Sequence, residues 1–322
     1  MLSAFVFDEE RSERVEDWTA ARGRLDSGEL LWVALRDPSE GEVAELVAAF
    51  ELEEKHARRL VESSKRASVA DDGEHLFVTI VAVGGDEDAP ELVPVEFVVG
   101  PNWVVTSHRH EVAVLEEFRE RAEGGGQVGA LDAPSFVAAI LEWVIASYLR
   151  AFEAVESELE ELDAKVIAET PTRSVSAELS KLVDHRHRIG SLRRALSPHR
   201  EVVVSLAHPE LDALSTEDSA RRFTELEKRV TLALEAARET KESTFGSFDL
   251  IEARIGQRTN DVMKVLTLGT VILLPATVLG GIMGMNFKVG LFENAHLFWA
   301  VIAMMLCIAA LVLAVARLRD WI

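Results

Sequence analysis

The sequence predicts an acidic α+β domain, followed by long helices and by two membrane-spanning helices near the C-terminus. Two runs of 23 residues, 265–287 and 294–316, contain no Asp, Glu, Lys or Arg. Short β-branched, apolar segments lie within residues 1–123, and no proline interrupts residues 210–274. An uncharged helix of about 20 residues is long enough to cross the hydrocarbon layer of a membrane. The chain is therefore expected to divide into a large soluble part and a short membrane hairpin.

Residues 1–130 are expected to form an α/β domain. Four segments have the β-branched and apolar composition that is typical of strands: 30–35, 76–83, 92–99 and 103–107. Gly100-Pro101-Asn102 predicts a hairpin turn between the last two of them. Residues 39–50 predict a helix that begins at an N-cap serine, Ser39. These segments predict a small sheet of three or four strands covered by helices. A flexible joint is expected at 123–129.

Residues 131–260 are expected to form a stalk of long helices. Residues 135–170 contain neither Pro nor Gly, and apolar side chains recur every four positions. These side chains belong to Phe136, Ile140, Val144, Tyr148 and Phe152. A second helix is expected between Pro171 and Pro198, because proline disrupts a helix interior. The proline-free segment 210–274 would be about 100 Å long as one helix, and such a helix needs partners to be stable.

Residues 261–322 are expected to form the membrane hairpin, with spans at about 265–285 and 295–316. Basic residues flank the outer ends of the two spans: Arg254, Arg258, Lys264, Arg317 and Arg319. The connecting loop has only Lys288 and Glu293. Because basic residues favour the cytoplasmic side, both termini are expected in the cytoplasm, and the absence of a secretory signal agrees.

The composition excludes several classes of function. The chain has 34 basic and 55 acidic residues, a net charge of −21, so it is not expected to bind nucleic acid. Its single cysteine, Cys307, can form neither an intrachain disulfide nor a cysteine-based zinc site. No Gly-x-x-x-x-Gly-Lys loop supports pumping driven by ATP, and no catalytic constellation stands out. Neither an enzyme nor a bound cofactor is expected.

The first predicted span carries a stripe of small and polar residues at alternating steps of three and four. The stripe consists of Asn260, Met263, Thr267, Thr270, Leu274, Thr277, Gly281 and Gly284. Two interpretations of this spacing remain open. Small residues allow membrane helices to pack tightly, but hydroxyl groups also suit the wall of a pore. A pore would need a closed homo-oligomer, because two spans from one chain cannot enclose it.

The span ends in the tripeptide Gly284-Met285-Asn286. With this motif between two terminal spans, the chain resembles the CorA family of divalent-cation channels. Residues 260–267 and Pro275 also look like the inner pore helix of that family. The resemblance implies a homopentameric funnel in a bacterial inner membrane, with an αβα sandwich as its cytoplasmic domain.

The resemblance also assigns positions along the pore. Asn286 would form a ring at the outer mouth, Gly281 and Thr277 would line the outer half, and Leu274 would lie deeper. The cytoplasmic neck would be formed by Asn260, Met263 and Leu266. At the neck the family suggests Leu266 where the spacing selects Thr267, and both can lie near the axis of a superhelical bundle.

The function that follows is influx of Mg²⁺, and also of Co²⁺ or Ni²⁺, driven by the membrane potential. The family binds cytoplasmic divalent ions between subunits, which makes Asp86, Asp88 and Glu225 candidate ligands of a regulatory ion. A solvated acidic surface is the competing interpretation of these carboxylates. Met283 and the loop 288–294 depart from the usual family pattern, so Zn²⁺ transport as in the ZntB branch stays open. An alternative of another class is a membrane-anchored helical scaffold or sensor that conducts no ions.

Overall fold

The computed structural model describes residues 2–8, 12–25, 28–61, 64–86, 89–123, 131–168, 175–208, 216–285 and 295–319. The predicted joint at 123–129 lies outside these ranges except for Glu123. The chain forms two compact units, Met1–Ser247 and Phe248–Ile322, which we call unit 1 and unit 2. Each unit is described by itself.

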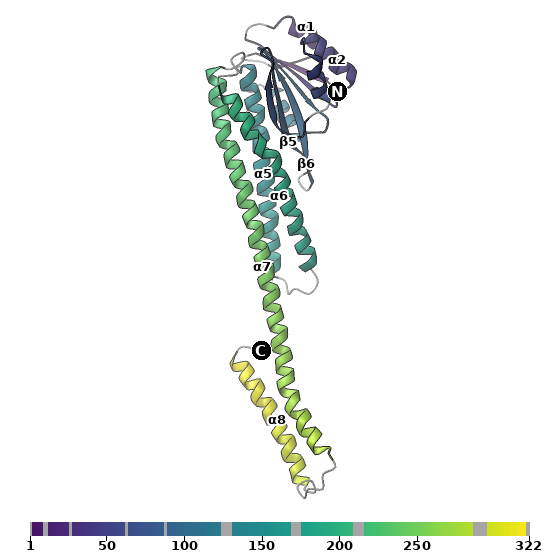
Figure 1. Cartoon of the computed structure of the whole chain (residues 1–322), viewed down its shortest axis with the longest axis vertical. Coiled ribbons are helices and arrows are strands. Elements are labelled where there is room, and N and C mark those ends of the chain that lie inside the picture. Colours follow the sequence, from purple (N-terminus) through teal and green to yellow (C-terminus); the bar gives the residue numbers. More distant parts are fainter. Residues whose placement is uncertain are drawn as a thin grey trace. The chain divides into compact units, whose positions relative to one another are not determined.

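Unit 1 is built on a β-sheet that includes β5 and β6 (Figure 1). The sheet has seven strands in the order β2-β1-β3-β7-β6-β5-β4. Its strands are β1 (Leu2–Phe7), β2 (Ser12–Val15), β3 (Leu30–Arg36), β4 (Ser68–Asp71), β5 (Leu76–Asp86), β6 (Ala89–Val99) and β7 (Trp103–His108). Neighbouring strands are antiparallel except β3 and β7, which are parallel. The four predicted strands are present, and the hairpin between β6 and β7 is confirmed. The expected number of strands was too low, because β1, β2 and β4 were missed.

Helices cover both faces of the sheet. Leu31 pairs with Trp103, so Trp103 lies on one face and Trp32 on the other. On the first face, Phe50 at the end of α2 (Glu40–Ala49) has its ring centroid 4.1 Å from that of Trp103. On the second face, Phe136 of α5 (Ala133–Ala168) lies 5.4 Å from Trp32. The αβα sandwich is thereby confirmed; α1 (Trp18–Arg22), α3 (Glu54–Val61) and α4 (Ala113–Glu123) complete the helical layers.

The start of α2 has the N-cap that the sequence predicts. The Ser39 hydroxyl accepts a hydrogen bond from the Glu42 backbone N–H at 3.3 Å, and the Glu42 carboxylate accepts one from the Ser39 backbone N–H at 2.8 Å. Both groups therefore satisfy a backbone donor that would otherwise lack a partner at the helix terminus.

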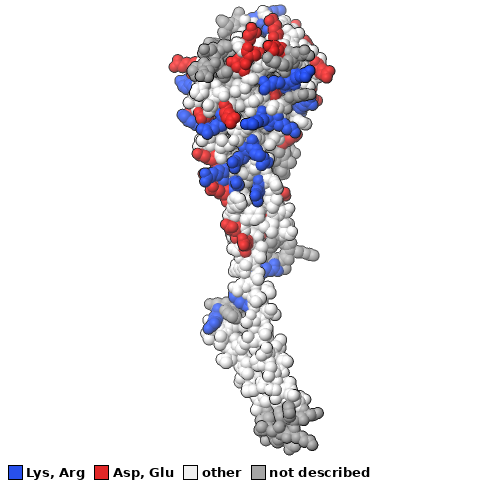
Figure 2. Space-filling view, in the orientation of Figure 1, with Lys and Arg blue, Asp and Glu red and all other residues white. Residues whose placement is uncertain are grey.

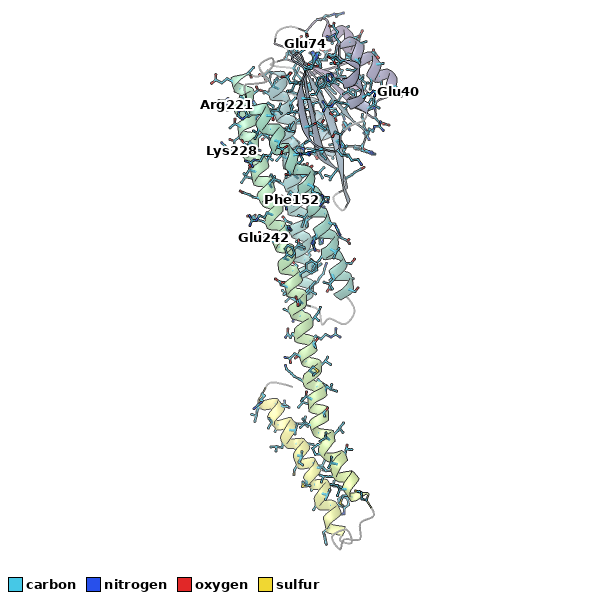
Figure 3. All side chains as sticks on the ribbon, in the orientation of Figure 1. Glu40, Glu74, Phe152, Arg221, Lys228 and Glu242 are labelled. Atoms are coloured by element: carbon cyan, nitrogen blue, oxygen red, sulfur yellow. The ribbon has the colours of Figure 1, made fainter. Side chains whose placement is uncertain are left out.

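Three long helices of unit 1 pack together: α5, α6 (Val175–Ala207) and the first part of α7 (Glu217–Met283). The predicted apolar series of α5 is fully buried, with Phe152 only 1% exposed. Ion pairs join the helices at their surface, at 2.7 Å between Arg229 and Glu142 and at 3.0 Å between Arg188 and Glu158. In Figure 3, Phe152 lies among the helices, whereas Lys228 lies on the outer side of α7. The long helix was expected to need partners, and within unit 1 its first part packs against α5.

The expectation that the second long helix ends before Pro198 is wrong, since α6 continues to Ala207. Proline removes one backbone donor from the helix. The next residue, His199, supplies an additional donor at the same turn, because its Nδ1 donates to the Ala195 carbonyl oxygen at 3.0 Å. Burial of His199 among α5, α6 and the sheet then holds the helix together across the proline.

His199 also joins α6 to the sheet. Its Nε2 accepts a hydrogen bond from the Val81 backbone N–H at 3.1 Å, and the Tyr148 hydroxyl of α5 donates to the Val81 carbonyl oxygen at 2.8 Å. Since Nε2 accepts, the neutral imidazole carries its proton on Nδ1. Complete burial lowers the pKa of His199 to about 4 and raises the pKa of Tyr148 above its usual range. The edge strand β4 pairs with β5 only as far as Thr79, so it does not reach Val81. Helices α5 and α6 satisfy the backbone N–H and C=O of Val81 instead.

Unit 2 consists of the C-terminal part of α7 and of α8 (Ala295–Leu318). Within the described ranges, three helices are long and apolar enough to cross a membrane: α5, α7 and α8. The most apolar window of α5 is 67% buried inside the protein, but those of α7 and α8 are 0% and 6% buried. The core of unit 1 accounts for the apolar residues of α5, and the two expected C-terminal spans are α7 and α8.

Candidate functional site

One side of α7 in unit 2 is covered. A row of partly or fully buried residues runs along it: Lys264, Leu268, Ile272, Pro275, Leu279 and Met283. Leu268 is the most buried of them, with 9% of its surface exposed. Apart from α7 itself, α8 is the only element that the structure describes in this unit, so we assign the cover to α8.

The predicted stripe lies on the opposite side of α7. Each residue of a helix is rotated by about 100° from the one before, which places the stripe roughly half a turn away from the covered row. All stripe residues are exposed, and so is Leu266; the values for Met263, Leu266 and Leu274 are 54%, 62% and 59%. Neither α8 nor another described part of unit 2 covers these residues. The stripe is available to other copies of the chain, to lipid or to water.

Two hydroxyl groups of the stripe are oriented by their own helix. Thr270 Oγ1 donates to the Leu266 carbonyl oxygen at 2.9 Å, and Thr277 Oγ1 donates to the Leu273 carbonyl oxygen at 2.8 Å. The hydroxyl protons are therefore used within the helix, while the oxygen lone pairs stay free to accept. Oxygens in this state can accept hydrogen bonds from the water shell of a cation, or contact a cation directly.

The end of the stripe is made of glycine and a helix terminus. Helix α7 ends at Met283, and the Gly284 N–H donates to the Gly280 carbonyl oxygen at 2.9 Å. A Cβ atom placed on Gly281 would meet no atom within 4 Å. Within one chain this surface is open, which allows close approach by another backbone or by a hydrated ion. Asn286, the last residue of the motif, lies outside the described residues.

The membrane part of the stripe contains no charge. The last charged residues before it are Asp261 and Lys264, whose side chains are 2.9 Å apart, and none occurs from 265 to 285. Any cation here would meet only neutral oxygens, from threonine hydroxyls or backbone carbonyls. Such oxygens attract a cation less strongly than carboxylates do, which favours passage over retention.

The candidate regulatory carboxylates are described only in part. Among the described residues, no group of three or more His, Cys, Asp or Glu is placed to hold a metal ion. The side chain of Asp86 is not described, and Asp88 lies outside the described residues. Glu225 is exposed and accepts from Lys228 Nζ at 2.8 Å, a hydrogen bond that lowers the pKa of Glu225. A regulatory ion site at these positions stays a prediction.

The covered row of α7 was not predicted from the sequence. Its residues recur at steps of three and four, as the stripe residues do, with a different starting point. A search for two rows at this spacing on one helix could have found it. Two rows on opposite sides are typical of a helix that contacts different neighbours on each side.

Residues 27–317 match the sequence model of the family described as "CorA-like Mg²⁺ transporter protein". The chain belongs to this family. The cobalt/magnesium transport protein CorA of Thermotoga maritima is 23% identical over 256 residues, which covers 77% of this chain and 70% of that protein. Divalent-cation transport across a membrane is therefore the general activity of the chain, and membership of a transporter family is consistent with the expected absence of enzyme activity.

Solved structures support the same fold. The complete structure of the CorA magnesium transporter from Methanocaldococcus jannaschii superposes with a TM-score of 0.80 at 20% identity, covering 99% of this chain and 98% of that chain. The ZntB cytoplasmic domain from Vibrio parahaemolyticus gives a TM-score of 0.62 at 11% identity, covering 80% and 99%. At these identities the likeness shows the fold alone, and it does not distinguish a magnesium transporter from a zinc transporter.

Proposed function

We propose that the chain forms a homopentameric channel for Mg²⁺, also permeable to Co²⁺ or Ni²⁺, whose pore is lined by the stripe of α7. The observation that carries this proposal is the exposure of the entire stripe on the side of α7 opposite the row that α8 covers. Hydroxyl groups and glycines gain nothing from contact with lipid, so this side is best satisfied by other copies of α7 around water. The number five comes from the resemblance to the CorA family.

In the proposed pore, Asn286 forms a ring of amide oxygens at the outer mouth, followed inwards by Gly281, Thr277 and Leu274. Thr270 and Thr267 continue the path, and Leu266, Met263 and Asn260 form the neck. Mg²⁺ prefers oxygen ligands and gives up its water reluctantly, so neutral oxygens that contact the water shell suit it. The bare apolar side chains of Leu274, Leu266 and Met263 would provide constrictions that close when water leaves them.

The membrane potential is the proposed driving force. Moving a divalent cation through 100 mV changes its free energy by about 4.6 kcal/mol, which favours entry into a cell with a negative interior. In the proposed orientation both termini lie in the cytoplasm of a bacterial-type cell, below the inner membrane. Residues 1–130, 131–260 and 261–322 then act as cytoplasmic domain, stalk and membrane hairpin, and cytoplasmic Mg²⁺ is proposed as a regulatory ion as well as the cargo.

Uptake by proteoliposomes tests the proposal. Wild-type protein is expected to admit Mg²⁺ under an inside-negative potential, and Asn286→Ala is expected to abolish uptake. Asn294→Ala is the matched control, because it removes an asparagine from the same connecting segment outside the motif. Equal uptake by both variants would contradict a role for Asn286, and wild-type liposomes that never admit a divalent ion would favour a non-conducting scaffold.

Competition between ions tests the choice of cargo. In the same liposomes, an excess of Co²⁺ or Ni²⁺ is expected to reduce Mg²⁺ uptake more than an equal concentration of Zn²⁺. Faster uptake of Zn²⁺ than of Mg²⁺, measured with ion-specific dyes inside the liposomes, would replace the magnesium assignment with zinc transport.

A further inference from the structure

A basic groove lies in unit 1. Its cavity has a volume of about 980 Å³ and is lined mainly by one face of α6. Six basic residues line it: Lys65, Arg66, Arg186, Arg193, Arg194 and Lys241. Figure 2 shows Lys and Arg side chains gathered on the face of unit 1 in view.

The described residues that line the groove carry no negative charge. No Asp or Glu is among its lining residues, although the chain has 55 of them and a net charge of −21. Arg66 is 3.8 Å from Glu201, and both side chains are largely exposed. Within the described part of the chain, the other five basic residues form no ion pair. Elsewhere in unit 1, exposed arginines such as Arg221 and Arg238 are paired with a carboxylate of their own helix.

The positive charges converge from three separate segments. Arg186, Arg193 and Arg194 share one face of α6, Lys65 and Arg66 precede β4, and Lys241 comes from α7. Gly190 lies on the same face of α6 between the arginines. A guanidinium nitrogen of Arg194 is 3.3 Å from where a Cβ of Gly190 would be, so the absence of that side chain gives the arginine room along the helix.

A bound anion would reduce the repulsion among these cations. The charged groups line one groove, are mostly exposed and, apart from Arg66, form no ion pair among the described residues, so a single phosphate would neutralise only a minority of them. A chain of phosphates can contact several at once, and arginine binds phosphate oxygens through two parallel hydrogen bonds. A volume of about 980 Å³ falls near the upper end of small-molecule sites, which are commonly about 300–1,000 Å³.

We propose that this groove binds a soluble polyphosphate, either free or as the tail of a nucleoside triphosphate. The phosphate chain is the part that is recognised, since the described lining residues include no Phe, Tyr or Trp to stack on a base. This site is separate from the proposed ion pathway and does not depend on it.

Calorimetric titration of the full-length chain in detergent tests the proposal. Inorganic tripolyphosphate, ATP and AMP are each added in the presence of EDTA, so that bound Mg²⁺ does not mask the phosphates. Tripolyphosphate and ATP are expected to bind at one site per chain with similar affinity, and AMP at least tenfold more weakly. Affinity is expected to fall as salt rises, because the contacts are ionic.

Two double variants separate the groove from general surface charge. Arg193→Gln with Arg194→Gln is expected to weaken tripolyphosphate binding at least tenfold. Arg221→Gln with Arg222→Gln removes the same charge from α7, at residues that contact Asp218, and is expected to leave binding within twofold. All four residues are exposed on helices, so folding should be retained, which circular dichroism verifies.

Three results would overturn the proposal. These are the absence of saturable binding by the wild type up to millimolar tripolyphosphate, equal weakening by both double variants, and AMP binding as tight as that of ATP. The absence of saturable binding is also the result expected if the acidic surface of a second copy fills the groove in the oligomer. Loss of ion uptake by the Asn286→Ala variant has no bearing on these titrations, so this proposal and the proposed function can fail independently.

Discussion

The two units of the chain place similar apolar helices in opposite environments. In unit 1, the most apolar window of α5 is 67% buried, and its aromatic residues pack against the sheet. In unit 2, the corresponding windows of α7 and α8 are 0% and 6% buried. Unit 1 buries the apolar surface of α5 within one chain, whereas the described residues of unit 2 leave that of α7 and α8 exposed, and the proposed pore would cover it with lipid and with other copies. A substitution in unit 1 should therefore change stability, and one on the stripe of unit 2 should change transport.

Adding a bulky side chain to the stripe should have the largest effect on transport. It is therefore the sharpest test of the difference between the two units. Gly281→Leu adds a side chain where no described residue lies within 4 Å apart from the backbone of the helix itself, so the described part of the chain can accommodate it. In the proposed pore the same side chain projects towards the axis, and uptake of Mg²⁺ is expected to fall at least tenfold in proteoliposomes.

The neighbouring variant Gly280→Leu is the matched control for Gly281→Leu. Gly280 also has nothing within 4 Å, but it lies about 100° around the helix from Gly281. Gly280→Leu is therefore expected to reduce Mg²⁺ uptake less than Gly281→Leu does. Equal losses from both variants would break the distinction between the stripe and the rest of the surface of α7.

Removing a core aromatic of unit 1 should have the next largest effect, on stability. Phe136 has no exposed surface and lies 5.4 Å from Trp32, so Phe136→Ala is expected to cost about 3–5 kcal/mol. Leu274→Ala, at a side chain that is 59% exposed, is expected to leave the unfolding midpoint of unit 1 unchanged. Thermal unfolding followed by tryptophan fluorescence measures both. A large shift from Leu274→Ala would show that the stripe also stabilises unit 1.

The buried histidine gives unit 1 a dependence on pH. Because the pKa of His199 falls from an unfolded value of 6.5 to about 4, the unfolded chain binds the extra proton first as the pH decreases. The stabilisation by neutral His199 is complete above pH 6.5 and is lost between pH 6.5 and 4, by roughly 3 kcal/mol.

The pH dependence is measured as the unfolding midpoint at several pH values. His199→Gln is expected to flatten the decrease between pH 6.5 and 4, and His208→Gln, which removes an exposed histidine, is expected to preserve it. An unchanged slope in the His199 variant would assign the acid sensitivity of unit 1 to other groups.

The smallest expected effect concerns a helix cap. Ser39→Ala removes the hydroxyl that accepts from the Glu42 backbone N–H, which is expected to cost about 1 kcal/mol. Ser180→Ala removes an exposed serine within α6 and is expected to stay within about 0.5 kcal/mol of the wild type. Chemical denaturation of unit 1 in the full-length protein compares the two variants.

The sequence predicted the central strands and the long helices of unit 1 better than its edges. Strands β3, β5, β6 and β7 are buried and carry long apolar runs. Strands β2 and β4 lie at the two edges of the sheet and have four residues each, too few to show a pattern. Pro198 was misleading because the buried His199, whose side chain donates within α6 at this turn, owes its position to tertiary packing.

The sequence predicted the stripe of the candidate site but left its meaning open. Heptad spacing cannot say which side of a helix a neighbour covers, and only the structure placed α8 and the stripe on opposite sides of α7. The basic groove was missed entirely, because Lys65, Arg194 and Lys241 are far apart in the chain and converge only after folding. The overall acidic charge of the chain concealed it further.

Cysteine accessibility tests the central claim, that the stripe faces water between copies of the chain. Thr277→Cys on the stripe and Val278→Cys beside it are each made with Cys307→Ser, because the native cysteine is exposed. A charged, water-soluble methanethiosulfonate reagent is expected to modify Cys at position 277 and to block Mg²⁺ uptake, while position 278 stays unmodified in the membrane. Modification at 278 alone, or equal modification of both without any effect on uptake, would contradict the account.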